Sequence, residues 1–153
     1  MKPKLLVSAC LLGTPCRYDG KSKKNEAVCA LAERFELIPV CPEVLGGLPT
    51  PRTPSERRGA CVVRKDGRDV TAEYRRGAEC ALETARREGV LAAVLKERRP
   101  SCGSGEIYDG TFTGALTAGD GVTAELLKSN GITVYGEGEQ SLTEFLCSVS
   151  HST

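Results

Sequence analysis

Short apolar runs alternate along this chain with longer segments whose apolar residues recur every three or four positions. The short runs are rich in Leu, Val, Ile and Ala and are bounded by Gly, Pro or polar residues, which is the pattern of buried strands. They predict strands at residues 5–10, 36–41, 90–96 and 132–135. Pro39 weakens the second prediction, because proline cannot donate a hydrogen bond to a sheet.

The segments with helical spacing predict helices that follow these strands. They cover residues 25–35, 71–88, 120–128 and 141–147. The second helix is the longest, and Gly89 is its expected end. Ser141 and Glu144 have the spacing of a capping box, which predicts the start of the last helix.

Two further segments have turn or loop character. Residues 59–70 predict a small hairpin that turns at Asp66 and Gly67, and residues 49–55 predict an ordered surface loop. Strands that alternate with helices favour parallel pairing with helices on both faces of the sheet. We therefore expect a single domain over residues 1–153, an α/β three-layer sandwich with a mostly parallel, Rossmann-like sheet.

Composition and charge narrow the function classes. Hydrophobic residues make up 40% of the chain and charged residues 27%, as in a soluble globular protein. No apolar run reaches membrane-spanning length and the N-terminus lacks a signal-peptide pattern, so we expect a cytoplasmic protein with no membrane partner. The formal net charge of +1 gives no case for strong nucleic-acid binding.

The chain has eight cysteines and one histidine, His151. Because disulfides are rare in a reducing compartment, this many cysteines favours metal or thiol chemistry. The single histidine lies three residues from the C-terminus, which argues against His-based triads and histidine-rich metal sites.

Three cysteines each follow a different predicted strand. Cys10, Cys41 and Cys102 stand beside Gly or Pro turns rather than inside apolar runs. The carboxyl ends of parallel neighbouring strands open on one edge of a sheet, where α/β proteins build their sites. We expect the three thiols to converge there, in contrast to the local cysteine pairs of zinc ribbons.

Three soft ligands without histidine indicate zinc or an iron–sulfur cluster, and three protein ligands leave one metal position open. Glu43, two residues after Cys41, is the best candidate for a general acid/base. The other protic groups near these cysteines are Ser8, Ser101 and Ser104. Ser101 adjoins Cys102 and is positioned by sequence to contact a substrate.

The loop after Cys10 carries Cys16, Arg17 and Tyr18, which either line the site or brace the loop. A cysteine-phosphatase site is not expected, because Pro15 removes a backbone donor from the loop and the arginine does not have the required spacing. Three roles stay open for Cys16: a residue that contacts the ligand cysteines without binding the metal, an alternative metal ligand, or a redox partner.

At these residues the sequence resembles the small bacterial thiouracil desulfidases. The matching stretches run in order over nearly the whole chain. They are VSACLLG at 7–13, CRYDG at 16–20, CPEVLGGL at 41–48, PR at 51–52, DVT at 69–71, SCG at 101–103 and YDGTF at 108–112. Longer relatives carry a further C-terminal domain and are linked to thiolated tRNA. This chain looks like the short form acting on a small-molecule thiolated base, so nucleic acid is not expected as a partner.

The resemblance implies a [4Fe-4S] cluster held by Cys10, Cys41 and Cys102, with one iron open as a Lewis acid. It implies non-redox desulfuration of a thiolated pyrimidine such as 2-thiouracil, which gives uracil and hydrosulfide. Glu43 would then act as general acid/base, and Ser101 would bind the ring or move a proton. The physiological substrate and the oligomeric state stay open.

Two alternatives use the same thiols. One is a structural zinc module with Cys16 as the fourth ligand beside Cys10, Cys41 and Cys102. The other is a thiol-redox protein that cycles a Cys10–Cys16 disulfide, although the spacing of these two cysteines is not the usual redox spacing.

Overall fold

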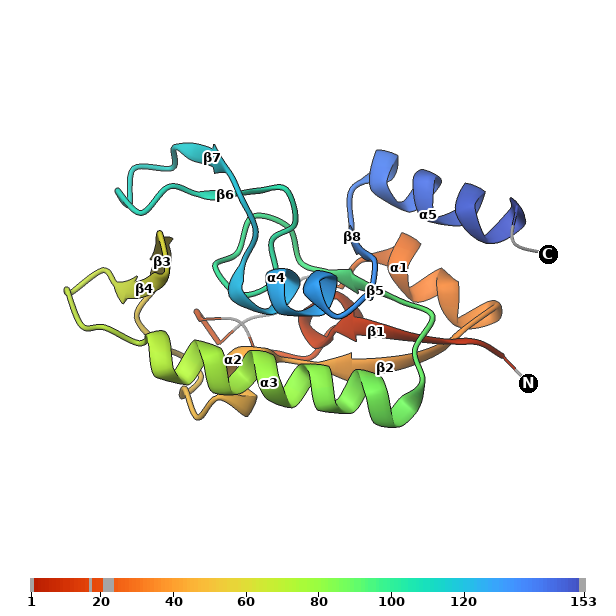
Figure 1. Cartoon of the computed structure of the whole chain (residues 1–153), viewed down its shortest axis with the longest axis horizontal. Coiled ribbons are helices and arrows are strands. Elements are labelled where there is room, and N and C mark those ends of the chain that lie inside the picture. Colours follow the sequence, from red (N-terminus) through yellow and green to blue (C-terminus); the bar gives the residue numbers. More distant parts are fainter. Residues whose placement is uncertain (1, 17, 21–23, 152–153) are drawn as a thin grey trace.

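A computed structural model gives the fold of residues 2–16, 18–20 and 24–151 (Figure 1). Within this part of the chain, four strands form a parallel sheet in the order β2-β1-β5-β8. They are β1 (Lys4–Ser8), β2 (Glu36–Val40), β5 (Ala92–Leu95) and β8 (Val134–Gly136). All the pairs are parallel, so the four carboxyl ends lie on one edge. The predicted fold class is confirmed.

The central strands are continuous apolar runs because both of their faces are covered. Leu5, Leu6 and Val7 of β1 have no exposed surface, and every residue of β5 is buried. Strands that are buried on two faces lose the alternation of apolar and polar residues. Pro39 is accommodated because β2 is an edge strand that pairs only with β1, and a proline, which has no N–H to donate, is tolerated in such a strand.

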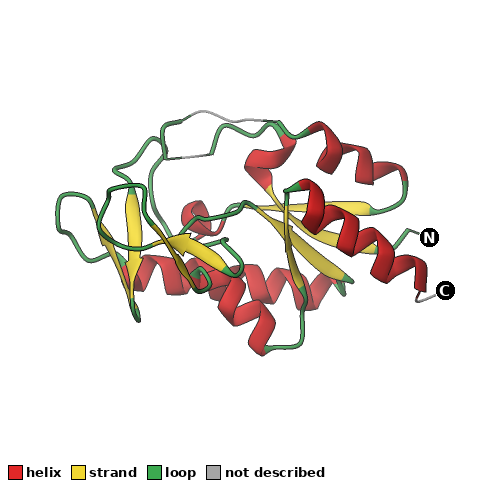
Figure 2. Ribbon diagram, turned by 90° about the horizontal axis from the view of Figure 1, so that it is seen from above, coloured by secondary structure: helices red, strands yellow, loops and turns green. Residues whose placement is uncertain are grey.

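Helices cover both faces of this sheet (Figure 2). On one face lie η1 (Ala9–Leu12), α1 (Glu26–Ala30), η2 (Leu31–Glu33) and α5 (Glu139–His151). On the other face lie α3 (Thr71–Glu88) and α4 (Val122–Ser129). None of the described helices is long and apolar enough to span a membrane.

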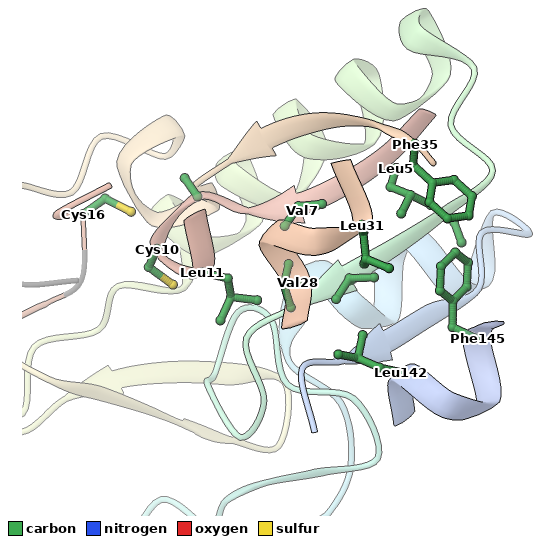
Figure 3. Packing of buried hydrophobic residues seen from close by; sticks show 13 residues of the cluster. Leu5, Val7, Cys10, Leu11, Cys16, Val28, Leu31, Phe35, Leu142 and Phe145 are labelled. Atoms are coloured by element: carbon green, nitrogen blue, oxygen red, sulfur yellow. The ribbon is translucent and has the colours of Figure 1, made fainter. Parts of the chain in front are cut away.

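The apolar residues between the sheet and the helices of the first face form a layer that reaches the carboxyl edge of the sheet. It runs from Phe35 and Phe145, whose ring centroids are 5.3 Å apart, to Cys10 and Cys16 at the other end (Figure 3). Val28 packs between the two ends and has no exposed surface. Cys10 and Cys16 therefore lie where the core meets the carboxyl edge.

Two antiparallel hairpins extend beyond that edge (Figure 1). One pairs β3 (Ser55–Arg58) with β4 (Cys61–Arg64), and the other pairs β6 (Glu106–Tyr108) with β7 (Leu116–Ala118). The hairpin predicted to turn at Asp66 and Gly67 is confirmed, because Val63 bridges Asp69 in antiparallel fashion and the backbone N–H of Val70 donates to the carbonyl oxygen of Val62 at 2.9 Å. The reversal at Gly59, whose φ of 59° suits glycine, was not predicted and pairs β4 with β3 as well.

The capping box predicted at Ser141 and Glu144 is wrong. Ser141 lies inside α5, and its hydroxyl accepts a hydrogen bond from the backbone N–H of Gly136 at 2.8 Å. The helix starts earlier, at Glu139, because the end of β8 takes the serine as a partner.

A short helix that the pattern did not predict, α2 (Pro42–Leu45), follows β2 directly. It packs against α3 through two glycines. A Cβ atom on Gly46 would overlap the carbonyl oxygen of Glu73, and one on Gly77 would overlap the carbonyl oxygen of Pro42. The close approach of these two backbones fixes the position of the turn that carries Cys41 and Glu43.

Candidate functional site

A cavity that opens to solvent lies at the carboxyl ends of β1, β2 and β5. The chain leaves β1 toward β2 on one side and reaches β5 on the other side. The loops after β1 and β5 therefore diverge, and α/β sheets form ligand crevices where this happens. The fold places the cavity at this switch point.

Cys10, Cys41 and Cys102 all line the cavity. Cys10 lies in η1 directly after β1, Cys41 precedes α2 at the end of β2, and Cys102 lies in the turn after β5. Cys10 is 9% exposed and Cys102 is 4% exposed, whereas Cys41 is half-buried. The structure therefore brings together the three cysteines that the sequence singled out.

The surroundings of these thiols work against their ionisation. Burial raises the pKa of Cys10 and of Cys102, and the nearby Glu43 carboxylate raises both further. Hydrogen bonds from Ser8 and Ser101 to the sulfur of Cys102 act in the opposite direction. A bound cationic centre removes this penalty, since thiolates rather than thiols are metal ligands.

Cys41 differs from the other two. A hydrogen bond with the Cys16 thiol lowers the pKa of Cys41 to about 7. When protonated, the Cys41 thiol donates to the carbonyl oxygen of Cys16, with sulfur and oxygen 3.7 Å apart. Cys16 is buried and lines the cavity, so it is a fourth thiol at the site.

The arrangement suits a cluster better than a single ion. The described side chains contain no group of three His, Cys, Asp or Glu residues close enough to hold one metal ion. A structural zinc ion needs four ligands around one point. In a [4Fe-4S] cluster each cysteine binds a different iron, so three soft thiols spaced around a cavity fit that group.

Glu43 lies on the cavity wall, with 15% of its side chain exposed. Its Oε2 accepts a hydrogen bond from Nη2 of Arg52 at 3.0 Å. Glu43 reaches this position because it lies in the first turn of α2, directly after Cys41 at the carboxyl edge of the sheet. The hydrogen bond from Arg52 fixes the orientation of a carboxyl group on the cavity wall, where such a group can take part in proton transfer.

The predicted serines have different surroundings. Ser8 lines the cavity, and its hydroxyl accepts a hydrogen bond from the backbone N–H of Lys96 at 2.9 Å. Ser101 has no exposed surface, its hydroxyl lies 2.8 Å from that of Thr123, and it is not among the residues that line the cavity. Ser104 is half-buried and is not part of the cavity wall.

Tyr18 lines the cavity, and the guanidinium carbon of Arg99 lies 5.4 Å from the centre of its ring. The predicted contact residue Arg17 lies outside the described residues. Sequence reasoning from the residues assigned no role to Arg52 or Lys96, which also line the cavity. No periodicity or local spacing points to these two, because their partners are distant in the chain.

Comparison with known proteins gives concordant matches. The family model described as 2-thiouracil desulfurase matches residues 5–139. The Bacillus subtilis (strain 168) protein YbbK is 43% identical over 145 residues, which is 88% of this chain and 96% of YbbK. A solved structure of TudS, described as a [4Fe-4S]-dependent thiouracil desulfidase, is 50% identical with a TM-score of 0.89. That match covers 97% of this chain and 99% of the TudS chain.

Proposed function

Because the chain belongs to the 2-thiouracil desulfurase family, we propose that it is a [4Fe-4S]-dependent thiouracil desulfidase. The reaction removes sulfur from a thiolated pyrimidine of the 2-thiouracil kind and yields uracil and hydrosulfide. The observation that carries the proposal is that three strand-ending cysteines and Glu43 share one cavity. The 50% identity to TudS over nearly both chains supports the same activity.

Cys10, Cys41 and Cys102 are the residues that would hold the cluster. Their thiolates form when the positive charge of the metal offsets the burial that raises the pKa of Cys10 and Cys102. When bound, the cluster supplies an iron that no cysteine holds, which is a Lewis acid suited to the soft sulfur of a thiocarbonyl.

Glu43 performs the proton chemistry in this proposal. Its carboxylate takes a proton from the water that attacks the ring carbon bearing the sulfur. The carbon–oxygen bond forms as the carbon–sulfur bond breaks, and Glu43 returns the proton, so that water and thiouracil become uracil and hydrogen sulfide or its anion. No electrons are gained or lost, and no reductant is needed.

The remaining side chains of the site are proposed to bind the pyrimidine ring or to assist Glu43. Ser8, Cys16 and Tyr18 line the cavity, so they are the proposed contacts to the ring. Ser101, which is hydrogen-bonded to the sulfur of Cys102, is the proposed residue that binds the ring or moves a second proton.

The alternative thiol-redox function lacks its expected pair. It required Cys10 and Cys16 to exchange a disulfide, whereas the hydrogen-bonded partner of Cys16 is Cys41. The desulfidase proposal therefore remains the better account of the cavity.

The proposal is tested by loading the protein with iron and sulfide under anaerobic conditions and adding 2-thiouracil. Uracil and hydrosulfide should appear in equal amounts. Changing Cys10, Cys41 or Cys102 to Ser should remove iron binding and turnover together. Cys147→Ser is the matched control, because that thiol is exposed on α5, far along the chain from the cavity residues. A loaded wild-type protein that converts no thiolated pyrimidine contradicts the proposal.

A further inference from the structure

Arg52 is a buried cation in the wall of the cavity. Its side chain is only 6% exposed, although it comes from the proline-rich loop between α2 and β3. Burying a guanidinium group is costly unless its charge is paired and its N–H groups are hydrogen-bonded. The contacts of Arg52 therefore indicate what keeps it there.

The hydrogen bonds of Arg52 join three segments. Its Nη1 donates to the carbonyl oxygens of Cys16 and Pro49, at 3.1 and 3.2 Å, and to the hydroxyl of Thr50 at 3.2 Å. Its Nη2 donates to Glu43 at 3.0 Å. Its backbone N–H donates to the carbonyl oxygen of Tyr18 at 2.5 Å. One side chain thus ties the loop after Cys10 to the α2 turn.

The two other cations on the cavity wall have different partners. Lys96 Nζ lies 2.5 Å from a carboxylate oxygen of Glu137, and Arg99 lies over the ring of Tyr18. Among the described residues, the ion pairs place Arg52 alone against Glu43. Three acceptors bind Nη1 and fix the orientation of the guanidinium group. Because Nη2 of the same group donates to Glu43, the position of the Glu43 carboxylate is fixed as well.

We propose that Arg52 is a positioning residue that holds the Glu43 carboxyl group in one orientation, directed into the cavity. This inference rests on the proposed desulfuration, in which Glu43 moves the proton. A glutamate side chain without this partner samples several rotamers. Misplacing a reacting group by about 1 Å costs about a hundredfold in rate. Lysine can supply the charge but not the planar fork that serves Glu43 and the loop carbonyls together.

The test compares Arg52→Gln and Arg52→Lys with wild type, each loaded with iron and sulfide and assayed with 2-thiouracil. We expect Arg52→Gln to bind iron as wild type does, to lose about a hundredfold in kcat and to change KM little. Arg52→Lys should recover part of kcat. Arg57→Gln is the control, since Arg57 is also mostly buried and paired but lies in β3 and not on the cavity wall.

A double-mutant cycle decides whether Arg52 acts through Glu43. In a Glu43→Gln background, Arg52→Gln should cause no further loss of kcat. Losses that multiply contradict the inference, and so does a loaded Arg52→Gln protein with wild-type kcat or with a raised KM alone. If Arg52→Gln does not fold, the same comparisons made with Arg52→Lys decide. An inactive wild type contradicts the proposed function itself, which separates the two failures.

Discussion

Replacing Gly77 by Ala tests whether the contact between α2 and α3 fixes the turn that carries Cys41 and Glu43. Gly77 is buried in α3, and a Cβ atom there would overlap the carbonyl oxygen of Pro42, between Cys41 and Glu43. The atoms that this Cβ would meet all belong to the backbone of Pro42, so no flexible side chain can move out of the way. The substitution must therefore push α2, and the turn before it, away from α3.

Two effects of opposite sign set the magnitude. Alanine is favoured over glycine in a helix interior by about 1 kcal/mol, which alone would stabilise the variant. Overpacking a tight contact costs about 1–3 kcal/mol, and a backbone displacement lies at the upper end. We expect the free energy of unfolding to fall by about 1–2 kcal/mol despite the gain in helix propensity.

Urea unfolding of the metal-free protein measures this change. The control is the pair Glu79→Ala and Glu79→Gly, at an exposed position of the same helix, where the alanine variant should be the more stable by about 1 kcal/mol. After anaerobic loading, Gly77→Ala should also bind less iron and turn over more slowly. A Gly77→Ala protein as stable as wild type, or more stable, would show that the contact between α2 and α3 tolerates a Cβ atom and does not fix the turn.

Three further outcomes are expected from the site. Glu43→Gln should keep its iron content and lose about 10²–10⁴-fold in kcat, because it removes the proton carrier and leaves the cysteines in place; loss of iron instead would make Glu43 structural. Thr123→Val should lower the free energy of unfolding by about 1 kcal/mol in a urea titration, because the fully buried Ser101 hydroxyl loses one of its hydrogen-bond partners and keeps only the sulfur of Cys102. An unchanged midpoint would contradict this. In the metal-free protein the pKa of Cys41 is lowered to about 7, so its thiolate is present above that pH. The rate of alkylation of Cys41, located by mass spectrometry, should therefore rise through pH 7. A rise only near the ordinary pKa of 9.0 would contradict the contact with Cys16.

The parts of the site that the sequence predicted follow from local pattern and sheet topology. The apolar runs of β1 and β5 are recognisable because burial on both faces makes them continuous. Cys10, Cys41 and Cys102 follow strands, and parallel pairing places such residues on one edge. Their convergence was therefore predictable, while their role as ligands stays a prediction.

What the sequence did not show depends on contacts between distant segments. The Arg52–Glu43 pair requires the 49–55 loop to fold back over α2, and no local pattern records that. Ser141 lost its predicted capping role because the end of β8 competes for its hydroxyl. The contact between the hydroxyls of Ser101 and Thr123 joins residues that are 22 positions apart, and no local pattern records it.

The most direct test of the account is turnover of 2-thiouracil in water labelled with heavy oxygen, by anaerobically loaded protein and without an electron donor. The account predicts uracil that carries one labelled oxygen atom, together with an equal amount of hydrosulfide. Failure to form uracil, or formation only when a reductant is supplied, would contradict the claim that the cavity at Cys10, Cys41, Cys102 and Glu43 performs a hydrolytic, redox-neutral desulfuration.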